Sequence, residues 1–344
     1  MIREASPVEG QDLTKVTARQ PHVAILMCTY NGEAYLKGQL DSFYDQTFSD
    51  WTLYVSDDSS TDETRNILLD YQHRWGSDRL IVFDGPCNGF AENFISLVRR
   101  PELKGDYFAF SDQDDIWFND KLTRSVGRLE PLSGKKPALY CSTTRLVDAD
   151  LNVIGVSKLF TRPPSFQNAL VQSIAGANTM LINRAARQLL LQLPDRAPLI
   201  AHDWLAYLLV TGCGGKVIYE AEPTLDYRQH SGNLIGANAS SRDRLVRLRK
   251  MLSGRFLKWN DANMIVLKKM EQMLTEENRH VLAHFDHGRQ QRFFQTHADA
   301  PESRHLQADT AGQSKPAAGC VPGQDLSGVA VEVTYRGRRY AGSQ

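Results

Sequence analysis

Short apolar runs alternate with segments of helical spacing through the first third of the chain. The run "HVAILMC" at 22–28 is continuous and partly β-branched, as in a buried strand, and Leu36, Leu40 and Phe43 then recur at helical spacing. Strands are expected at 22–28, 51–56, 79–84 and 106–110, and helices at 33–46 and within 57–71 and 85–100. This alternation predicts an α/β fold with an open, mixed but mostly parallel sheet flanked by helices.

Polar residues gather where each expected strand ends. Open α/β sheets bind ligands at the carboxyl ends of their strands, where the strand order reverses. The four expected strands are followed by Thr29–Asn31, Asp57–Asp58, Asn88–Gly89 and Asp112–Asp115. The sequence therefore predicts a Rossmann-like nucleotide-binding half over residues 21–117, with its ligand site at this edge.

The rest of the chain falls into segments that differ in composition and in hydrophobic pattern. Residues 118–240 mix strand-like segments ("ALYCS", "GKVIYE") with helix-like ones ("NRAARQLLLQL", "DWLAYLLV") and are predicted to complete one domain as its acceptor half. Residues 1–20 are polar and predicted to form a flexible arm. Residues 241–292 form a basic and then polar helical segment, and 293–344, rich in Gly, Ala, Ser, Gln and Pro, are predicted to be disordered.

Composition excludes several classes of protein. Forty Lys and Arg balance forty Asp and Glu, so no global field attracts nucleic acid, and we expect no nucleic-acid partner. The five cysteines form no C-x-x-C pair, which suits a reducing compartment. No run reaches the roughly 18–20 apolar residues of a spanning helix, and the N-terminus has no apolar stretch typical of a signal peptide. We expect a cytoplasmic protein.

The fourth expected strand runs directly into three carboxylates, Asp112, Asp114 and Asp115. Like charges this close raise one another's pKa, which predicts a cation between them. Alternate residues of an extended segment point the same way, so Asp112 and Asp114 could face one ion. Oxygen ligands with few protein contributions suit Mg²⁺ or Mn²⁺. A solvated acidic turn is the plainer interpretation, and the position after a strand favours the metal.

Two neighbouring loops could hold a nucleotide or merely turn the chain. Asp58 could accept hydrogen bonds from a ribose or a base, or Asp57, Asp58 and Ser60 could only make turns and cap the next helix. Ser60 and Glu63 have the spacing of a capping box. The loop "TYNGE" after the first strand could offer its amides to a nucleotide. It matches neither G-x-G-x-x-G nor the P-loop pattern, so both of those fingerprints are absent.

Two later segments could supply proton transfer and phosphate binding. Asp203 begins an apolar helix, where it is either a first-turn carboxylate favoured by the helix dipole or a general base for an acceptor hydroxyl. His202 is a weaker candidate for that base. Arg228, His230 and Asn233 lie in a glycine-bearing loop that could close over phosphates, although a lone histidine is as often a structural hydrogen bonder.

Taken together, these motifs resemble the family 2 glycosyltransferases with the GT-A fold, especially rhamnosyltransferase-like bacterial members that build surface polysaccharide. The resemblance spans 22–240 and rests, in the family's order, on "CTYNGEAYL", "VSDDSSTDET", "NGFAENF", "SDQDDIWFNDKL", "GANTMLINRAA", "HDW" and "YRQHSGN". One departure is "HDW", where many members carry Glu-Asp. The tail after residue 292 matches nothing in the family.

The resemblance implies a nucleotide-sugar donor, a divalent metal ion and inversion at the anomeric carbon. The candidate donor contacts are Thr29, Tyr30, Glu33, Asp58, Asn88 and Asp112. The metal candidates are Asp114, which would also face the diphosphate, Asp112 and His230, while Asp203 matches the catalytic base. The candidate acceptor contacts are Asp115, Trp117 and Trp204.

The donor and acceptor are less closely defined. Subfamily likeness favours dTDP-L-rhamnose, followed by UDP-linked hexoses, with a saccharide or lipid-linked saccharide as acceptor. A sugar-phosphate nucleotidyltransferase would need a basic, glycine-rich loop after the first strand, which "TYNGEAYLKGQL" matches poorly. A nucleotide-sugar-binding protein without turnover stays open until donor turnover is assayed.

Residues 242–258 combine basic side chains with interleaved apolar ones. This segment could make peripheral contact with an anionic membrane, which would bring the site close to a lipid-linked acceptor. Equally, it could be a solvated helix that packs on the catalytic domain.

Overall fold

The main sheet has seven strands, six of them parallel. A computed structural model of the protein describes residues 20–132, 134, 136–230 and 255–298. Its strands are β1 (Val23–Thr29), β2 (Trp51–Asp57), β3 (Leu80–Asp84), β4 (Tyr107–Ser111), β6 (Ala138–Ser142), β9 (Leu181–Asn183) and β10 (Lys216–Glu220). They lie in the order β10-β6-β9-β4-β1-β2-β3, and β9 alone runs antiparallel to its neighbours. The predicted fold class is confirmed.

Helices cover both faces of this sheet. One face carries α1 (Leu36–Tyr44), α2 (Thr64–Trp75) and α4 (Lys121–Leu129), and the other α3 (Phe90–Val98), α6 (Arg184–Leu191) and α7 (His202–Gly212). The side chains of β1 alternate between the two cores, with Ile25 and Met27 in one and Ala24 and Leu26 in the other. Each side chain this fully buried contributes about 1.5–3 kcal/mol if it is Val, Leu, Ile, Phe or Met.

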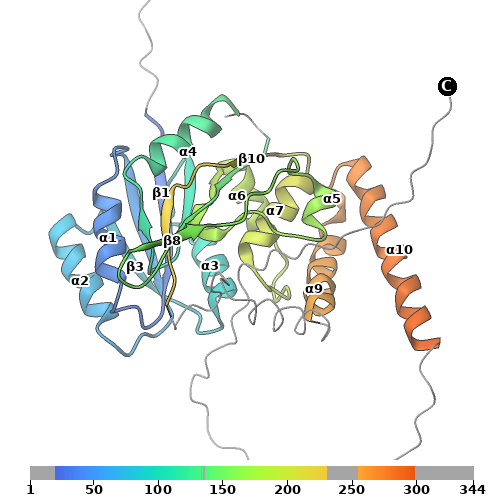
Figure 1. The fold of residues 1–344 in the computed structure, drawn as a ribbon, viewed down its shortest axis with the longest axis horizontal. Helices are drawn as coiled ribbons and strands as arrows, with labels where there is room; N and C mark the ends of the chain where they lie inside the picture. Colours follow the sequence, from blue (N-terminus) through green and yellow to red (C-terminus); the bar gives the residue numbers. More distant parts are fainter. Residues whose placement is uncertain (1–19, 133, 135, 231–254, 299–344) are drawn as a thin grey trace, which may run out of the picture.

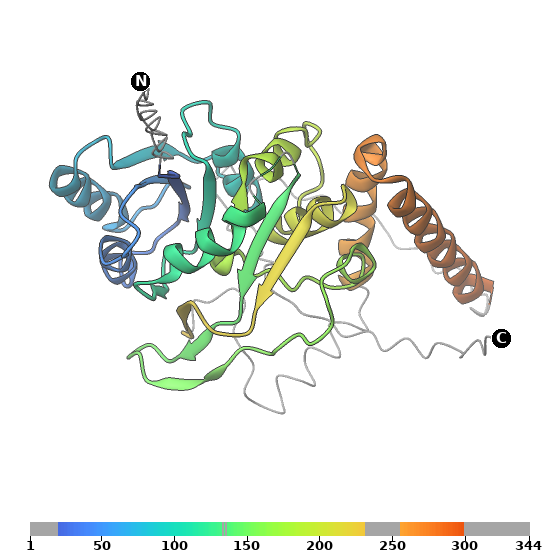
Figure 2. The ribbon, with the colours of Figure 1, turned by 90° about the horizontal axis from the view of Figure 1, so that it is seen from above.

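A second, smaller sheet lies to one side of the main one (Figure 2). It contains β5 (Ile116–Trp117), β11 (Leu225–Arg228), β7 (Arg145–Val147) and β8 (Val153–Val156), in the order β5-β11-β7-β8. Because β11 pairs with β5, the segment at 228–230 is brought beside the acidic loop at 112–115. Short elements complete the domain: η1 (Glu130–Leu132), α5 (Phe166–Ala169) and η2 (Ala177–Thr179).

The predicted helical segment after residue 240 contains two α-helices among the described residues, α9 (Arg255–Lys269) and α10 (Glu276–Ala298), joined through η3 (Glu271–Met273). They lie at the opposite end of the molecule from α1 and α2 (Figure 1). Trp259 of α9 packs edge-on against Trp204 of α7, with ring centroids 6.4 Å apart. Residues 1–19 of the predicted arm (1–20), most of the basic segment 242–258 and residues 299–344 of the predicted tail (293–344) lie outside the described residues. The first residues of that tail, which were predicted to be disordered, are helical, because α10 extends to Ala298. Within the described ranges, no helix has both the length and the apolar character needed to cross a bilayer.

The predicted capping box at Ser60 and Glu63 is wrong. Helix α2 begins at Thr64 with no side-chain cap, because the Ser60 hydroxyl donates instead to Asp57 Oδ1 at 2.6 Å. The Glu63 carboxylate accepts from Asn66 within the helix. Ser60 therefore stabilises the loop after β2 and not the helix terminus.

Candidate active site

The predicted site lies at the point where the strand order reverses. The chain leaves β1 toward β2 and β3 and returns on the other side of β1 as β4. The carboxyl ends of these strands lie level, since Thr29 pairs with Asp57 and Met27 with Ser111. The loops after β1 and β4 therefore flank the crevice in which such sheets bind ligands.

Gln113, the middle residue of the D-x-D, joins these two loops. Its Oε1 accepts from the Tyr30 N–H at 2.9 Å, and its Nε2 donates to the Tyr30 carbonyl at 3.1 Å. Gly32 leaves room for this amide, because a Cβ there would lie 2.4 Å from Gln113 Oε1. Asp112 and Asp114 flank Gln113, so the bridge ties the loop that carries both acids to the first loop.

The two acids after β2 have different surroundings. Asp57 is buried, accepts from the Thr29 hydroxyl at 2.8 Å and pairs with Arg65 Nε at 3.0 Å. Thr29 and Asp57 thus satisfy each other inside the protein. Asp58 accepts from the Cys87 N–H at 2.6 Å, which ties the loop after β2 to the loop after β3.

Burial raises the pKa of the Asp58 carboxyl, and the Asp57 charge adds to that increase, while the Cys87 and Gly89 backbone N–H groups oppose it. A carboxyl in this position can accept hydrogen bonds from a bound ligand. Asn88 is exposed in the same loop, between Cys87 and Gly89.

The remaining predicted donor contacts lie on the first loop. Tyr30 is 41 % exposed. Glu33 is exposed, its N–H donates to Asp62 Oδ2 at 3.0 Å, and its carboxylate accepts from the Glu63 N–H at 2.8 Å. Glu33 therefore joins the first loop to the start of α2. The structure thus brings the predicted donor residues of the first three loops to one edge of the sheet.

Asp114 contacts the last residue of β11 and the segment that follows this strand. His230 Nε2 lies 2.9 Å from Asp114 Oδ2, and Arg228 Nε donates to the Asp114 carbonyl at 3.0 Å. The His230 ring also packs against Tyr35, with centroids 4.6 Å apart. His230 therefore contacts the Asp114 carboxylate directly, and its role as a metal ligand stays a prediction.

The side chains at this edge can be compared with the ligands that the predicted metal ion needs. Within the described ranges, no three His, Cys, Asp or Glu side chains form a group that could hold a metal ion alone. Mg²⁺ usually keeps several waters and is bound through one or two carboxylates and substrate phosphates. Asp114 with Asp112 fits that mode, and a site built wholly from protein ligands does not fit.

Asp115 belongs to a buried network that the sequence did not indicate. Its carboxylate accepts from Asn178 Nδ2 at 2.7 Å and from the Arg228 N–H at 3.3 Å. Burial raises the pKa of Asp115 well above its usual range, and the Asp114 and Asp112 charges add to the rise. Lys121 is also buried and donates to the Asn178 carbonyl at 2.9 Å. Burial lowers the pKa of Lys121 to about 7, and the nearby Asp115 charge opposes that decrease.

The three predicted acceptor contacts are all buried. Asp115 is 0 %, Trp117 3 % and Trp204 4 % exposed. Trp117 packs edge-on against Phe43 at 4.7 Å, and Trp204 Nε1 donates to the Ala169 carbonyl at 2.7 Å. All three side chains lie inside the protein in this structure, as Asp203 does, and their contact with an acceptor stays a prediction. Position beside a motif does not reveal whether an aromatic side chain points inward.

Asp203 and His202 begin α7. Asp203 is buried, and its Oδ1 accepts from the Trp204 N–H at 2.7 Å. His202 is buried too, stacked on Phe94 with ring centroids 4.0 Å apart, and neither ring nitrogen has a hydrogen-bond partner among the residues described. Burial lowers the pKa of His202 to about 3, far from the value of a base that works near neutral pH.

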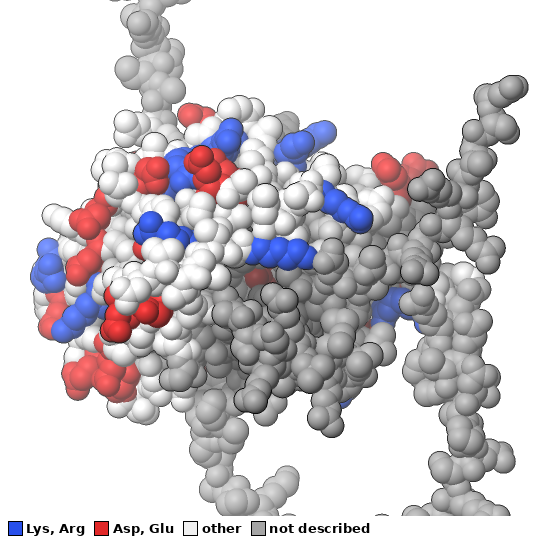
Figure 3. Space-filling view, viewed as in Figure 1, with Lys and Arg blue, Asp and Glu red and all other residues white. Residues whose placement is uncertain are grey.

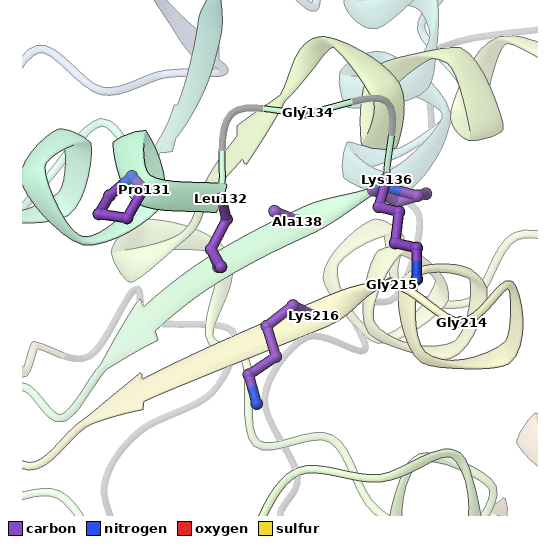
Figure 4. A pocket seen from close by; sticks show the side chains of 9 residues that line it. Pro131, Leu132, Gly134, Lys136, Ala138, Gly214, Gly215 and Lys216 are labelled. Carbon is purple, nitrogen blue, oxygen red and sulfur yellow. The ribbon is translucent and has the colours of Figure 1, made fainter.

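A cavity of about 430 Å³ lies elsewhere (Figure 4). It lies at the amino ends of β6 and β10, where Ala138 pairs with Lys216, and Lys136, Gly214 and Gly215 also line it. The predicted site lies at the opposite, carboxyl edge of the sheet. None of the predicted site residues lines this cavity.

Comparison with known proteins identifies the family. Residues 24–179 match the family model described as glycosyl transferase family 2. The dTDP-rhamnosyl transferase RfbG of Shigella flexneri is 30 % identical over 234 residues, which cover 64 % of this chain and 78 % of that protein. The chain belongs to glycosyl transferase family 2. These two matches confirm that the chain is a family 2 glycosyltransferase, as its sequence motifs indicated.

Other similar proteins cover less of their own length or are more distant. The putative teichuronic acid biosynthesis glycosyltransferase TuaG of Bacillus subtilis is 30 % identical over 172 residues, 49 % of this chain and 65 % of that protein. Among solved structures, S. aureus TarS 1-349 in complex with UDP-GlcNAc has a TM-score of 0.48 at 18 % identity, covering 62 % of this chain and 60 % of that chain. The mannosyltransferase PcManGT from Pyrobaculum calidifontis in complex with GDP-Man and Mn²⁺ has a TM-score of 0.48 at 14 % identity, covering 80 % and 82 %.

Proposed function

We propose that this glycosyltransferase moves a sugar from a nucleotide-sugar donor to a saccharide or lipid-linked saccharide acceptor during surface polysaccharide synthesis. The observation that carries the proposal is the bridging of the D-x-D loop to the first loop, through Gln113 and Tyr30, at the switch point of the sheet. The similarity to RfbG, named a dTDP-rhamnosyl transferase, favours dTDP-L-rhamnose as the donor.

In this proposal, exposed groups at this edge of the sheet bind the donor. Tyr30 and Asn88 present surface there, and Asp58, whose burial raises its pKa, can accept hydrogen bonds from a ribose or a base. Asp114 and Asp112 would hold Mg²⁺ or Mn²⁺. Such an ion stabilises the charge that develops on the departing diphosphate, an effect typically worth several kcal/mol. His230 and Arg228 orient the Asp114 segment for this task.

Asp203 is the proposed general base. It accepts the proton of the acceptor hydroxyl as that oxygen attacks the anomeric carbon from the face opposite the diphosphate. One in-line displacement inverts the centre and needs no enzyme nucleophile. General-base catalysis typically contributes 10²–10⁴-fold to the rate.

The proposal includes contact of the segment 242–258 with an anionic membrane. Flotation of the protein with anionic vesicles, before and after the basic residues of this segment are neutralised, tests that contact.

Metal-dependent donor binding tests the donor site. Donor affinity is measured by thermal shift over a Mn²⁺ titration, with dTDP-L-rhamnose and UDP-linked hexoses, because a ligand of the folded state raises its melting temperature. Asp114→Ala should abolish the Mn²⁺-dependent shift. Asp195→Ala removes a carboxylate whose side chain is 98 % exposed, and this control should leave the shift unchanged. A Mn²⁺-dependent shift that survives in Asp114→Ala removes Asp114 from the metal site.

The rate of sugar transfer tests the proposed role of Asp203 as the general base. Asp203→Asn keeps the shape of the side chain and loses its basicity, so we expect donor binding to persist while transfer falls by about 10²–10⁴-fold. Transfer at the wild-type rate by Asp203→Asn would exclude this role. Donor binding without transfer or donor hydrolysis in the wild type would instead favour a binding protein without turnover.

A further inference from the structure

The most exposed apolar stretch of the described chain lies on and around the edge strand β8. Nine large apolar side chains among the described residues are exposed, and five of them fall between residues 151 and 159. They are 44–59 % exposed and comprise Leu151, Val153, Ile154, Val156 and Leu159. Exposed apolar side chains that are scattered singly are ordinary, whereas five within nine residues favour an interaction site.

β8 also has a free edge among the described strands. It ends the order β5-β11-β7-β8, so its outer backbone groups have no partner strand there. Edge strands are usually protected by charged side chains, proline or a covering segment. The sequence of β8 is Val-Ile-Gly-Val, with neither charge nor proline, whereas the main-sheet edge strand β10 begins with Lys216 and ends with Glu220. β8 is therefore open to strand addition.

The charges on either side of β8 indicate which partner would fit. The turn that precedes it carries Asp148 and Asp150, and the segment that follows carries Lys158 and Arg162. This face of the molecule carries both signs interspersed (Figure 3). The balance of acid and base gives no net attraction to an anionic membrane. It is instead self-complementary, because two antiparallel copies of β8 place the acidic end of one copy against the basic end of the other.

We propose that β8 pairs with β8 of a second copy of this chain across a two-fold axis, which would join the two small sheets into one. A two-fold contact presents the same patch from both copies. Asp150 lies in the turn before β8 and Lys158 in the segment after it, so antiparallel pairing of β8 brings the acidic turn of one copy near the basic segment of the other. β8 lies at the outer edge of the small sheet, beyond β7, and is not adjacent to β11, which carries Arg228.

The mass in solution tests this pairing. Light scattering on a size-exclusion column should give twice the 38.7 kDa of one chain for the full-length protein, and a dilution series gives its dissociation constant. Ile154→Lys puts a charge into the paired strands and should give the mass of one chain. Ile265→Lys is the matched control, because Ile265 on α9 is similarly exposed at 47 %, and this variant should remain a dimer.

A charge exchange makes the test specific to the proposed orientation. Asp150→Lys and Lys158→Asp should each weaken the dimer by about tenfold, since the axis repeats each lost pair, and the double variant should restore it. Melting temperatures verify that all variants are folded. A wild-type mass of one chain throughout the dilution series overturns the proposal, and so does a double variant weaker than either single one. Vesicle binding that Ile154→Lys abolishes, with a mass of one chain, would assign the surface to a membrane instead.

Discussion

Removing the Gln113 amide should weaken donor binding without unfolding the protein. In Gln113→Ala, the first loop loses two hydrogen bonds to the D-x-D loop. A hydrogen bond contributes about 0.5–1.5 kcal/mol net, and a partly exposed pair falls toward the lower part of that range. If the bridge must be formed for the donor to bind, its loss costs about 1–2 kcal/mol, or roughly a five- to thirtyfold lower donor affinity.

Gly32 provides an independent route to the same defect. A Cβ at residue 32 would lie 2.4 Å from Gln113 Oε1 and 2.5 Å from Cδ, so Gly32→Ala must displace the amide. If Gly32→Ala acts only through Gln113, it should weaken binding in the wild type and have no further effect in Gln113→Ala. Such non-additivity is measured by a double-mutant cycle. Gly127→Ala on α4 is the control, because an added Cβ there meets nothing within 4 Å.

The assay is donor affinity by calorimetry at saturating Mn²⁺, with the melting temperature recorded for each variant. Wild-type affinity in Gln113→Ala would refute the reasoning, and additive losses in the double variant would show that Gly32 acts by another route. These outcomes are distinct from failure of the proposed function, which Asp114→Ala tests separately.

Two further predictions concern buried ionisable groups outside the donor site. His202 has a pKa of about 3 in the fold, against 6.5 for the free side chain, so the unfolded chain binds more protons between these values and stability falls as pH drops through them. Keeping His202 neutral in the fold lowers the free energy of unfolding by about 2 kcal/mol at pH 5. His202→Phe should therefore lose less stability than the wild type between pH 7 and pH 5, as measured by urea unfolding. An unchanged pH dependence would contradict the assignment. Lys121→Met removes the hydrogen bond from the buried Lys121 ammonium to the Asn178 carbonyl and should lower the free energy of unfolding by about 1–3 kcal/mol; a variant as stable as the wild type would show that this hydrogen bond is not needed.

The parallel core could be predicted from sequence because its strands are buried on both faces. β1 and β2 are continuous apolar runs that need no alternation to be recognised. The strands β5, β7 and β9 have only two or three residues, too few to establish a period, and they form because their neighbours in the sheet offer hydrogen bonds. Local pattern therefore predicted the six parallel strands of the main sheet and missed β9 and the strands of the small sheet.

The site was predicted in position and less well in detail. The carboxyl ends of the strands follow from topology, so the loops at residues 30, 58 and 112–115 could be placed together in advance. The Gln113 amide could not be assigned, because its partner Tyr30 lies 83 residues away. Asp57 and Asp58 are neighbours in sequence, and only the structure shows that Asp57 is satisfied internally by Thr29 and Arg65.

The charge argument that first suggested a cation changes once the partners of each acid are known. Three adjacent carboxylates predicted a positive partner, and the protein itself accounts for one of them. Asp115 is buried against Asn178, with the Lys121 ammonium nearby, and burial raises its pKa so that its proton is held more tightly. The proposed cation site therefore involves Asp112 and Asp114, of which Asp114 contacts His230. Two carboxylates would be enough to hold Mg²⁺ or Mn²⁺ together with water and the phosphate oxygens of a bound donor, because Mg²⁺ is usually held through one or two carboxylates and substrate phosphates.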